Sequence, residues 1–139
     1  MRRTTVALAA CIGLLGCGES VPPTHAVYML LDTSGTYVQE IKKAQAITNY
    51  LLGTLAGGDS LGVARIDSAS FTEKDIVAKV TFDSRPSHAN QQKRAFRRKL
   101  DRFVGEARRS SFTDISGGML QAAEWIRETG AGHKYILIF

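Results

Sequence analysis

The residues with the clearest chemical potential are Asp32, Ser34 and Thr36, which carry a carboxylate and two hydroxyls at alternate positions. The apolar run 26–31 precedes them directly, and an amphipathic segment follows. A turn from a buried strand to a helix lies at the carboxyl end of the strand, where open α/β sheets place their ligand sites. Three oxygens in a tight turn can point at one spot, as a hard cation such as Mg²⁺ requires. The spacing therefore predicts a metal-centred binding site.

The segments around this turn predict a strand, a helix and a second strand. The run 26–31 has the length and continuous apolarity of a central parallel strand that is covered on both faces. From Val38 to Ala56 apolar residues recur near helical spacing, and a pair of glycines at 57–58 ends the helix. A second strand follows over 61–66, so the unit is expected to be parallel and right-handed.

The rest of the chain predicts four further elements. Alternation over 76–82 indicates a strand with one wetter face, and the segment before it is too short for a helical crossover, so an antiparallel edge strand is expected. Pro86 is expected to close this strand region. A second helix is expected from Ala89, then a polar loop over 105–112, a third helix that stops at Gly130, and a last buried strand over 135–139. The buried stripe expected on the third helix consists of Ile115, Met119, Ala122, Ala123 and Ile126.

Length and composition fit one globular domain. The 139 residues include 44% hydrophobic and 22% charged side chains, which is ordinary for a domain with one core. The formal net charge of +5 falls to +3 if Arg2 and Arg3 are lost, which is too weak a bias to imply nucleic acid. Because the sequence stops on an apolar strand whose far edge nothing covers, we expect it to be a piece of a longer protein.

The first sixteen residues have the pattern of an export signal. Arg2 and Arg3 supply positive charge, and an eleven-residue apolar core runs from Val6 to Gly16. A helix of that length spans ~16 Å, about half of the hydrocarbon thickness, so a permanent transmembrane helix is not expected. We therefore expect export, with 1–16 acting as a signal peptide.

The segment 14–17, with the sequence Leu-Leu-Gly-Cys, resembles the bacterial lipobox, in which the cysteine receives a diacylglyceryl group and the signal is cut before it. The resemblance implies lipidation of Cys17, a tether over 17–24, and a globular part over 25–139 that is anchored to a membrane of the cell envelope. In a Gram-negative cell this would be the periplasmic side of the outer membrane. Cys11 also fits the pattern but would leave an apolar core of only five residues. The alternative is that Cys17 is a free thiol beside an ordinary cleavage site.

The order of elements and two motifs resemble a von Willebrand factor A (vWA) domain. In that family the metal-ion-dependent adhesion site (MIDAS) begins with D-x-S-x-S after the first strand, takes a threonine from the loop before the third helix, and ends with an aspartate after the fourth strand. Here Asp32, Ser34 and Thr36 match the first motif, with threonine in the final serine position. Thr113 matches the threonine of the second loop. The third aspartate would follow Phe139, so the sequence does not reach it.

The resemblance implies a Rossmann-like three-layer α/β sandwich, mostly parallel with one antiparallel edge strand, here incomplete. It also implies a Mg²⁺ site, or one for Mn²⁺ or Ca²⁺. Asp32 would act mainly through water, and Ser34 and Thr36 would ligate directly. Thr113 would join or leave with the state of the ligand. A protein partner would supply a carboxylate as the last ligand, so the expected function is metal-dependent protein binding without catalysis.

Two alternatives remain open for this turn. Asp32, Ser34 and Thr36 are residue types that also cap helices, which would leave a vWA-like scaffold or interaction domain without metal. The same stretch resembles the D-K-T-G-T motif of phosphoaspartyl-type hydrolases, in which the aspartate is the nucleophile. Thr33 replaces the lysine of that motif, and Ser34 stands where dehalogenase-type enzymes have a second aspartate. The hydrolase is therefore the less favoured alternative.

A basic cluster on the second expected helix is a candidate electrostatic partner face. It consists of Lys93, Arg94, Arg97 and Arg98, continued by Lys99, Arg102, Arg108 and Arg109. Phe96, Leu100 and Phe103 form the opposite stripe of the helix, so the charges are expected to be a solvated face. Anionic lipid headgroups or an acidic partner are the alternatives, and nucleic acid is not expected.

Five other residues are assigned structural roles. Asp114 is expected to cap the third helix, and Trp125 is expected to lie in the core or to cover it partly. The histidines His25, His88 and His133 fall in expected loops without the spacing of metal ligands, so surface or packing roles are expected for them.

Overall fold

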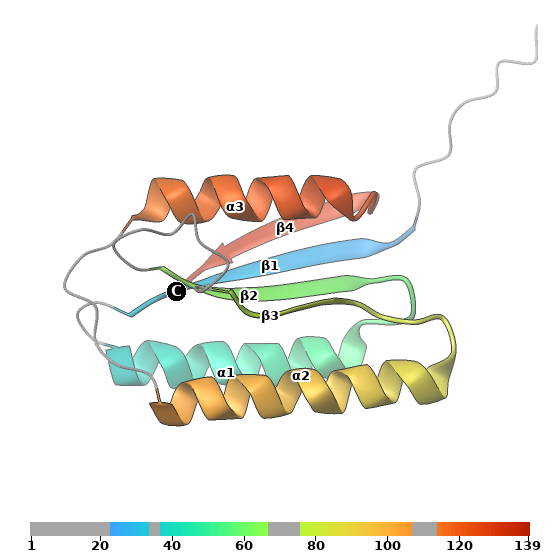
Figure 1. Ribbon diagram of the computed structural model, residues 1–139, viewed down its shortest axis with the longest axis horizontal. Helices are drawn as coiled ribbons and strands as arrows, with labels where there is room; N and C mark the ends of the chain where they lie inside the picture. Colours follow the sequence, from blue (N-terminus) through green and yellow to red (C-terminus); the bar gives the residue numbers. More distant parts are fainter. Residues whose placement is uncertain (1–22, 34–36, 67–75, 107–113) are drawn as a thin grey trace, which may run out of the picture.

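The structure is a computed structural model of the chain, and it describes residues 23–33, 37–66, 76–106 and 114–139, with the backbone alone for 37–39 (Figure 1). Four strands and three helices follow one another along these residues. In chain order they are β1 (His25–Asp32), α1 (Tyr37–Thr54), β2 (Ser60–Ile66), β3 (Ile76–Thr81), α2 (Pro86–Glu106), α3 (Ile115–Glu128) and β4 (His133–Ile138). Each helix and strand expected from the sequence is present, with its ends shifted by at most a few residues.

The sheet has the strand order β3-β2-β1-β4. β1 lies in the interior and pairs in parallel with β2 on one side and with β4 on the other. β3 pairs antiparallel with β2, and the register shifts between Val63 and Ala64. The structure thus confirms an open, mostly parallel α/β sheet with one antiparallel edge strand, as the short connection before β3 predicts.

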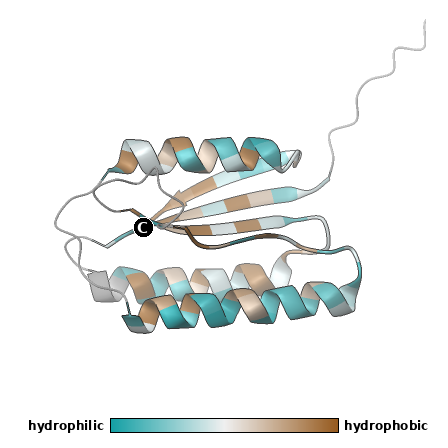
Figure 2. Cartoon of the chain, viewed as in Figure 1, coloured by the Kyte–Doolittle hydropathy of each residue, from teal (hydrophilic) through white to brown (hydrophobic). Residues whose placement is uncertain are grey.

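Helices cover both faces of the sheet, which gives three layers (Figure 1). α1 and α2 lie side by side on one face, and α3 lies alone on the other. Figure 2 shows hydrophobic residues along the strands, whereas much of α2 is hydrophilic. None of the helices in the described ranges is both long and apolar enough to cross a membrane.

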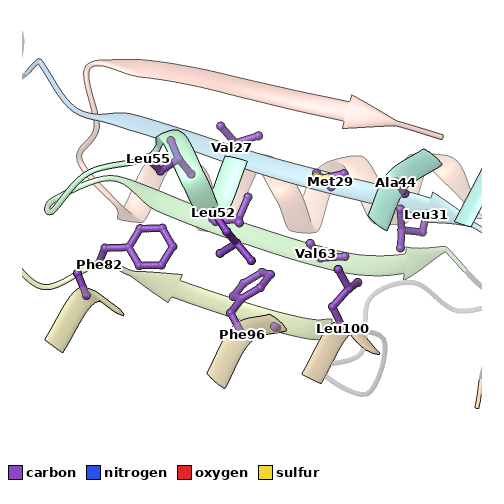
Figure 3. Close-up of a cluster of buried hydrophobic side chains, with 13 residues drawn as sticks. Val27, Met29, Leu31, Ala44, Leu52, Leu55, Val63, Phe82, Phe96 and Leu100 are labelled. Carbon is purple, nitrogen blue, oxygen red and sulfur yellow. The ribbon is translucent and has the colours of Figure 1, made fainter. Parts of the chain in front are cut away.

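Alternate residues of β1 feed two separate cores. Val27, Met29 and Leu31 belong to the core under α1 and α2, and the residues between them belong to the core under α3. Every position of 26–31 is at most 5% exposed, which explains why the run is apolar throughout. The first core also contains Ala44, Leu52, Leu55, Leu61, Val63, Ala78, Phe82, Ala89, Phe96 and Leu100 (Figure 3).

The core under α3 is built around Tyr28, whose ring lies over Gly62 of the neighbouring strand. A Cβ atom at Gly62 would lie 2.5 Å from Cδ2 of Tyr28, so a larger residue would displace the ring. Trp125 of α3 is half-buried against this ring, with 5.4 Å between centroids and an interplanar angle of 57°. Tyr28 is fully buried, and its hydroxyl donates to Oε1 of Gln121 at 3.4 Å. The partly buried role expected for Trp125 is confirmed.

α2 begins at Pro86 and extends to Glu106, into the segment expected as a loop. The prediction of a start at Ala89 is wrong because proline suits the first position of a helix, where its missing N–H would have no partner. Just upstream, Oδ1 of Asp83 accepts from the backbone N–H of Arg85 at 2.8 Å. A side-chain hydrogen bond from Arg85 holds the pKa of the Asp83 carboxyl below its usual range.

The buried stripe expected on α3 is only partly correct. Ala122 and Ile126 are buried, but Ile115 and Met119 are each 44% exposed and Ala123 is exposed as well. The helix rests on the sheet through positions 118, 122 and 126, which are spaced by four residues. Met119 and Ala123, which follow positions 118 and 122 by one residue, therefore face outward. A single helix thus buries a narrower strip than the sequence pattern indicates.

β4 begins at His133 and is the outer strand of the described sheet on the side away from β3. Tyr135 and Ile138 are 47% and 46% exposed, so the prediction of a buried strand is wrong for the residues described. Ile136 and Leu137 are half-buried against the two cores. An apolar run thus indicates a strand here without indicating that both of its faces are covered.

Candidate functional site

Asp32 is the last residue of β1 and lies half-buried where β2 and β4 also end. Its backbone N–H donates to the carbonyl oxygen of Phe139 at 2.7 Å, and the N–H of Phe139 donates to the carbonyl oxygen of Leu30 at 3.0 Å. On the other side Asp32 is the register partner of Ile66. The backbone of Asp32 is therefore fixed by neighbours on both sides.

Contacts with β2 also hold the next residue, Thr33, in place. Its side chain is fully buried, and its hydroxyl donates to the carbonyl oxygen of Ile66 at 3.4 Å. No local pattern in the sequence predicts this role of Thr33, because only the pairing of β1 with β2 brings Ile66 within reach. The chain thus leaves the sheet at a defined position, which is a condition for a site on the residues that follow.

The crossovers next to β1 and β4 lie on opposite faces of the sheet. α1 follows β1 on one face, whereas α3 precedes β4 on the other (Figure 1). β1 and β4 are also neighbouring parallel strands. Their shared carboxyl edge is therefore a topological switch point, the position at which open α/β sheets form ligand-binding crevices. Asp32 stands at this switch point.

Asp114 begins α3 at the same edge of the sheet (Figure 1). Its Oδ1 accepts from the backbone N–H of Gly117 at 2.9 Å, which confirms the expected helix cap. Gly118 then lies close to β1, since a Cβ atom there would contact Cδ2 of Leu30 at 3.4 Å. The first turn of α3 therefore packs on β1 only two residues before Asp32.

Whether the donor set fits a metal depends on its chemistry. One carboxylate and three hydroxyls suit a hard cation such as Mg²⁺, which prefers oxygen ligands and keeps several waters. Asp32 is the one predicted donor within the structure, and Ser34, Thr36 and Thr113 lie outside the described residues, as does the predicted lipidation site Cys17. Among described side chains, no three of the His, Cys, Asp and Glu types are placed to hold a metal ion. The predicted site, with one carboxylate and three hydroxyls, would not contain such a group of three.

Lys93 differs from the other three residues predicted as an electrostatic partner face. Its Nζ donates to the carbonyl oxygen of Leu55 at 2.6 Å and lies 5.4 Å from the centroid of the Phe82 ring. Lys93 therefore joins α2 to the chain that follows α1. The other three are arginines with exposed side chains.

The amino-terminal edge of the sheet brings together three residues that are far apart in the sequence, His25, Asp59 and His133. His25 and His133 are register partners, and their rings stack with centroids 4.9 Å apart. Asp59 is buried next to His25. Its Oδ1 accepts from the backbone N–H of His25 at 2.7 Å, and its Oδ2 accepts from the backbone N–H of Ala56 at 2.8 Å. The prediction of histidines in loops is wrong, because two begin strands and His88 lies in α2. No local signal predicts this cluster, since it depends on the pairing of distant strands.

In comparisons with known proteins, the chain matches no protein-family model and no curated sequence.

Proposed function

We propose that this chain is a divalent-metal-dependent protein-binding module of the vWA kind, with its site at the carboxyl end of β1. The position of Asp32 at the switch point between β1 and β4 carries the proposal. This carboxylate ends the interior strand at the edge where open α/β sheets place their ligand sites. α3 begins at Ile115 at the same edge, and the predicted donor Thr113 precedes its N-cap residue Asp114 in the sequence.

In this proposal Asp32 holds the cation through water, Ser34 and Thr36 supply hydroxyl ligands, and Thr113 exchanges with the ligand state. The cation, when bound, supplies a positive charge with an open position for a carboxylate of the partner. The chain itself fixes the start of the turn through the backbone of Asp32 and orients the start of α3 through Asp114. Binding without turnover is the proposed activity.

We place the module in the bacterial cell envelope, anchored through a lipid on Cys17. The support comes from the leader pattern of 1–16 and from the short tether over 17–24. Such an anchor would hold the domain at a membrane while its site stays available to other envelope proteins.

A vWA-like scaffold without metal is the second candidate. Two observations favour it, because Asp114 is engaged as a helix cap and the hydroxyl of Thr33 bonds within the fold. Polar residues near this edge therefore have structural roles that do not require a cation. Asp32 distinguishes the two candidates, since only the metal-binding module needs its charge for ligand binding.

Calorimetric titration of Mg²⁺ and Mn²⁺ into the full chain tests the proposal. Wild-type protein is expected to bind the metal, and Asp32→Asn is expected to weaken binding by about tenfold or more, because the neutral amide no longer attracts the hydrated cation. Thr113→Ala is expected to weaken it less. Asp101→Asn, which removes a charge from the exposed surface of α2, is the matched control and should leave binding unchanged.

Two results would contradict the proposal. One is a wild-type chain that is folded by circular dichroism but binds neither metal. The other is metal binding that Asp32→Asn leaves unchanged while the Asp101→Asn control behaves as expected. Either result would favour the scaffold without metal.

A further inference from the structure

The outer face of α2 carries a straight row of arginines. Arg94, Arg98 and Arg102 are exposed and are spaced by four residues, so they lie on one side of the helix, about 6 Å apart along its axis. Phe96 and Leu100 lie on the opposite side, buried at 3% and 1% exposure against the sheet. The row spans about 12 Å on the outermost surface of that layer.

Neighbouring charges neutralise this row only slightly. Within the described residues the ion pair on α2 joins Arg97 to Asp101 at 3.9 Å, and both side chains are largely exposed, so its contribution is small. Asp101 also accepts from Nε2 of Gln45 at 2.8 Å. Arg94, Arg98 and Arg102 form no ion pair with another described side chain, and Lys99 adds a further exposed charge beside them.

We propose that this face of α2 adsorbs to a membrane surface rich in anionic lipid. A row of cations on a convex helix fits a plane of negative charge better than it fits a single anion, which would need a pocket with converging donors. The exposed positions that flank the row are polar or small, as at Gln91 and Gly105, and Glu106 follows Arg102 at the same spacing, so nothing on this face inserts among acyl chains. Binding is therefore electrostatic and sensitive to salt.

The geometry of the domain agrees with this orientation. β1 and α2 begin at the same end of the molecule and run in the same direction in separate layers (Figure 1). The segment 17–24 can span up to about 26 Å when extended, so a lipid on Cys17 would allow α2 to lie flat on the membrane. The carboxyl edge with Asp32 would then face sideways along the membrane and remain open to a partner. The adsorption itself requires neither lipidation nor metal.

Vesicle sedimentation of the full chain tests the inference. The Cys17→Ser background prevents lipidation at that position, and neutral phosphatidylcholine vesicles measure whatever the apolar leader contributes. With about 30% phosphatidylglycerol, binding is expected to increase and then to fall steeply between about 50 and about 500 mM salt. R94E/R98E/R102E is expected to weaken the binding to anionic vesicles by about tenfold or more, and R94Q/R98Q/R102Q by less.

A matched control reverses the same number of charges on other elements. Lys42, Arg127 and Lys134 are exposed on α1, α3 and β4, so K42E/R127E/K134E changes the net charge equally without touching α2. This control is expected to bind anionic vesicles nearly as well as the Cys17→Ser parent. Circular dichroism checks that each variant is folded.

Three results would overturn the inference. The first is an equal loss of vesicle binding in the control and in the α2 variant. The second is a preference for anionic vesicles that the α2 substitutions leave intact. The third is binding to duplex DNA at physiological salt without binding to vesicles. The last result would identify the row as a phosphate-backbone surface instead. Because no metal is present in these assays, their outcome is independent of the metal titration.

Discussion

The two faces of the sheet are packed in different ways, although alternate residues of the same strands supply both. Under α1 and α2 the core consists of aliphatic side chains and Phe82 and Phe96, which two helices cover together (Figure 3). Under α3 a single helix covers the sheet, and the wide ring of Tyr28 fills the space above Gly62. A face with one helix thus depends on an aromatic residue and a glycine on adjacent strands, whereas a face with two helices depends on many interchangeable aliphatic contacts.

The two faces are therefore expected to be destabilised by different kinds of substitution. On the α1 and α2 face, damage arises from a cavity when a large side chain is removed. On the α3 face, damage arises from overlap when a side chain is added at Gly62.

Phe96→Ala is expected to have the largest effect. Phe96 is 3% exposed in the core under α2, and its truncation should lower the free energy of unfolding by about 3–5 kcal/mol. Urea unfolding followed by circular dichroism measures the change. Phe96→Leu fills part of the cavity and should recover a large share of the loss. If the two variants are equally destabilised, the cavity is not the cause.

Gly62→Ala is expected to destabilise by about 1–3 kcal/mol, because the added Cβ atom overlaps the buried Tyr28 ring at 2.5 Å. Gly53→Ala is the matched control, since nothing lies within 4 Å of the added Cβ atom in α1. That control should stabilise the protein by about 0.5–1 kcal/mol through helix propensity. Equal effects of the two substitutions in thermal or urea unfolding would remove the proposed role of glycine at 62.

Tyr28→Phe is expected to have the smallest effect near neutral pH, below about 1 kcal/mol, because the hydrogen bond to Gln121 is long at 3.4 Å. Burial raises the pKa of Tyr28 to about 12, above its value of about 10 in an unfolded chain. The folded state therefore disfavours the ionised ring. The stability that comes from a neutral Tyr28 is complete below pH ~10 and is lost as pH rises toward 12.

The pH dependence separates Tyr28 from other groups that titrate in the same range. Between pH ~9 and pH ~11 the wild type should lose about 1 kcal/mol more than Tyr28→Phe, as measured by urea midpoints at each pH. If the free energy of unfolding falls equally with pH in the two proteins, the Tyr28 ring ionises without opening the α3 face.

Local sequence signals predicted most of the elements, because each rests on the geometry of a few neighbouring residues. Gly130 is an example, since it directly follows the C-cap residue Thr129 of α3 with a φ of 65°, a region that suits glycine and few other residues. Gly58, with a φ of 90°, instead lies in the turn before β2, four residues after α1 ends. Asp114 was predictable as a cap for the same reason. At the candidate site, the position of Asp32 at the end of an interior strand followed from the apolar run that precedes it.

Other features could not be predicted because they depend on which distant segments meet. Pro86 can close a strand or begin a helix, and the extended helix beyond it decides the outcome. The position of Lys93 is another case, since its bond to Leu55 requires the packing of α2 beside α1. The stacking of His25 on His133 likewise follows from the register of β1 with β4.

Short-range patterns were enough to predict the order of the elements, the interior position of the first strand and the aspartate that ends it, because hydrophobic periodicity and turn residues act over short distances. The tertiary structure decided that Asp32 stands at a switch point and that Thr33 bonds to the end of β2. It also decided that the arginines of α2 form one exposed row while Lys93 is used inside the fold. These outcomes depend on strand order and on the rotation of each helix against the sheet, which contacts between distant residues fix.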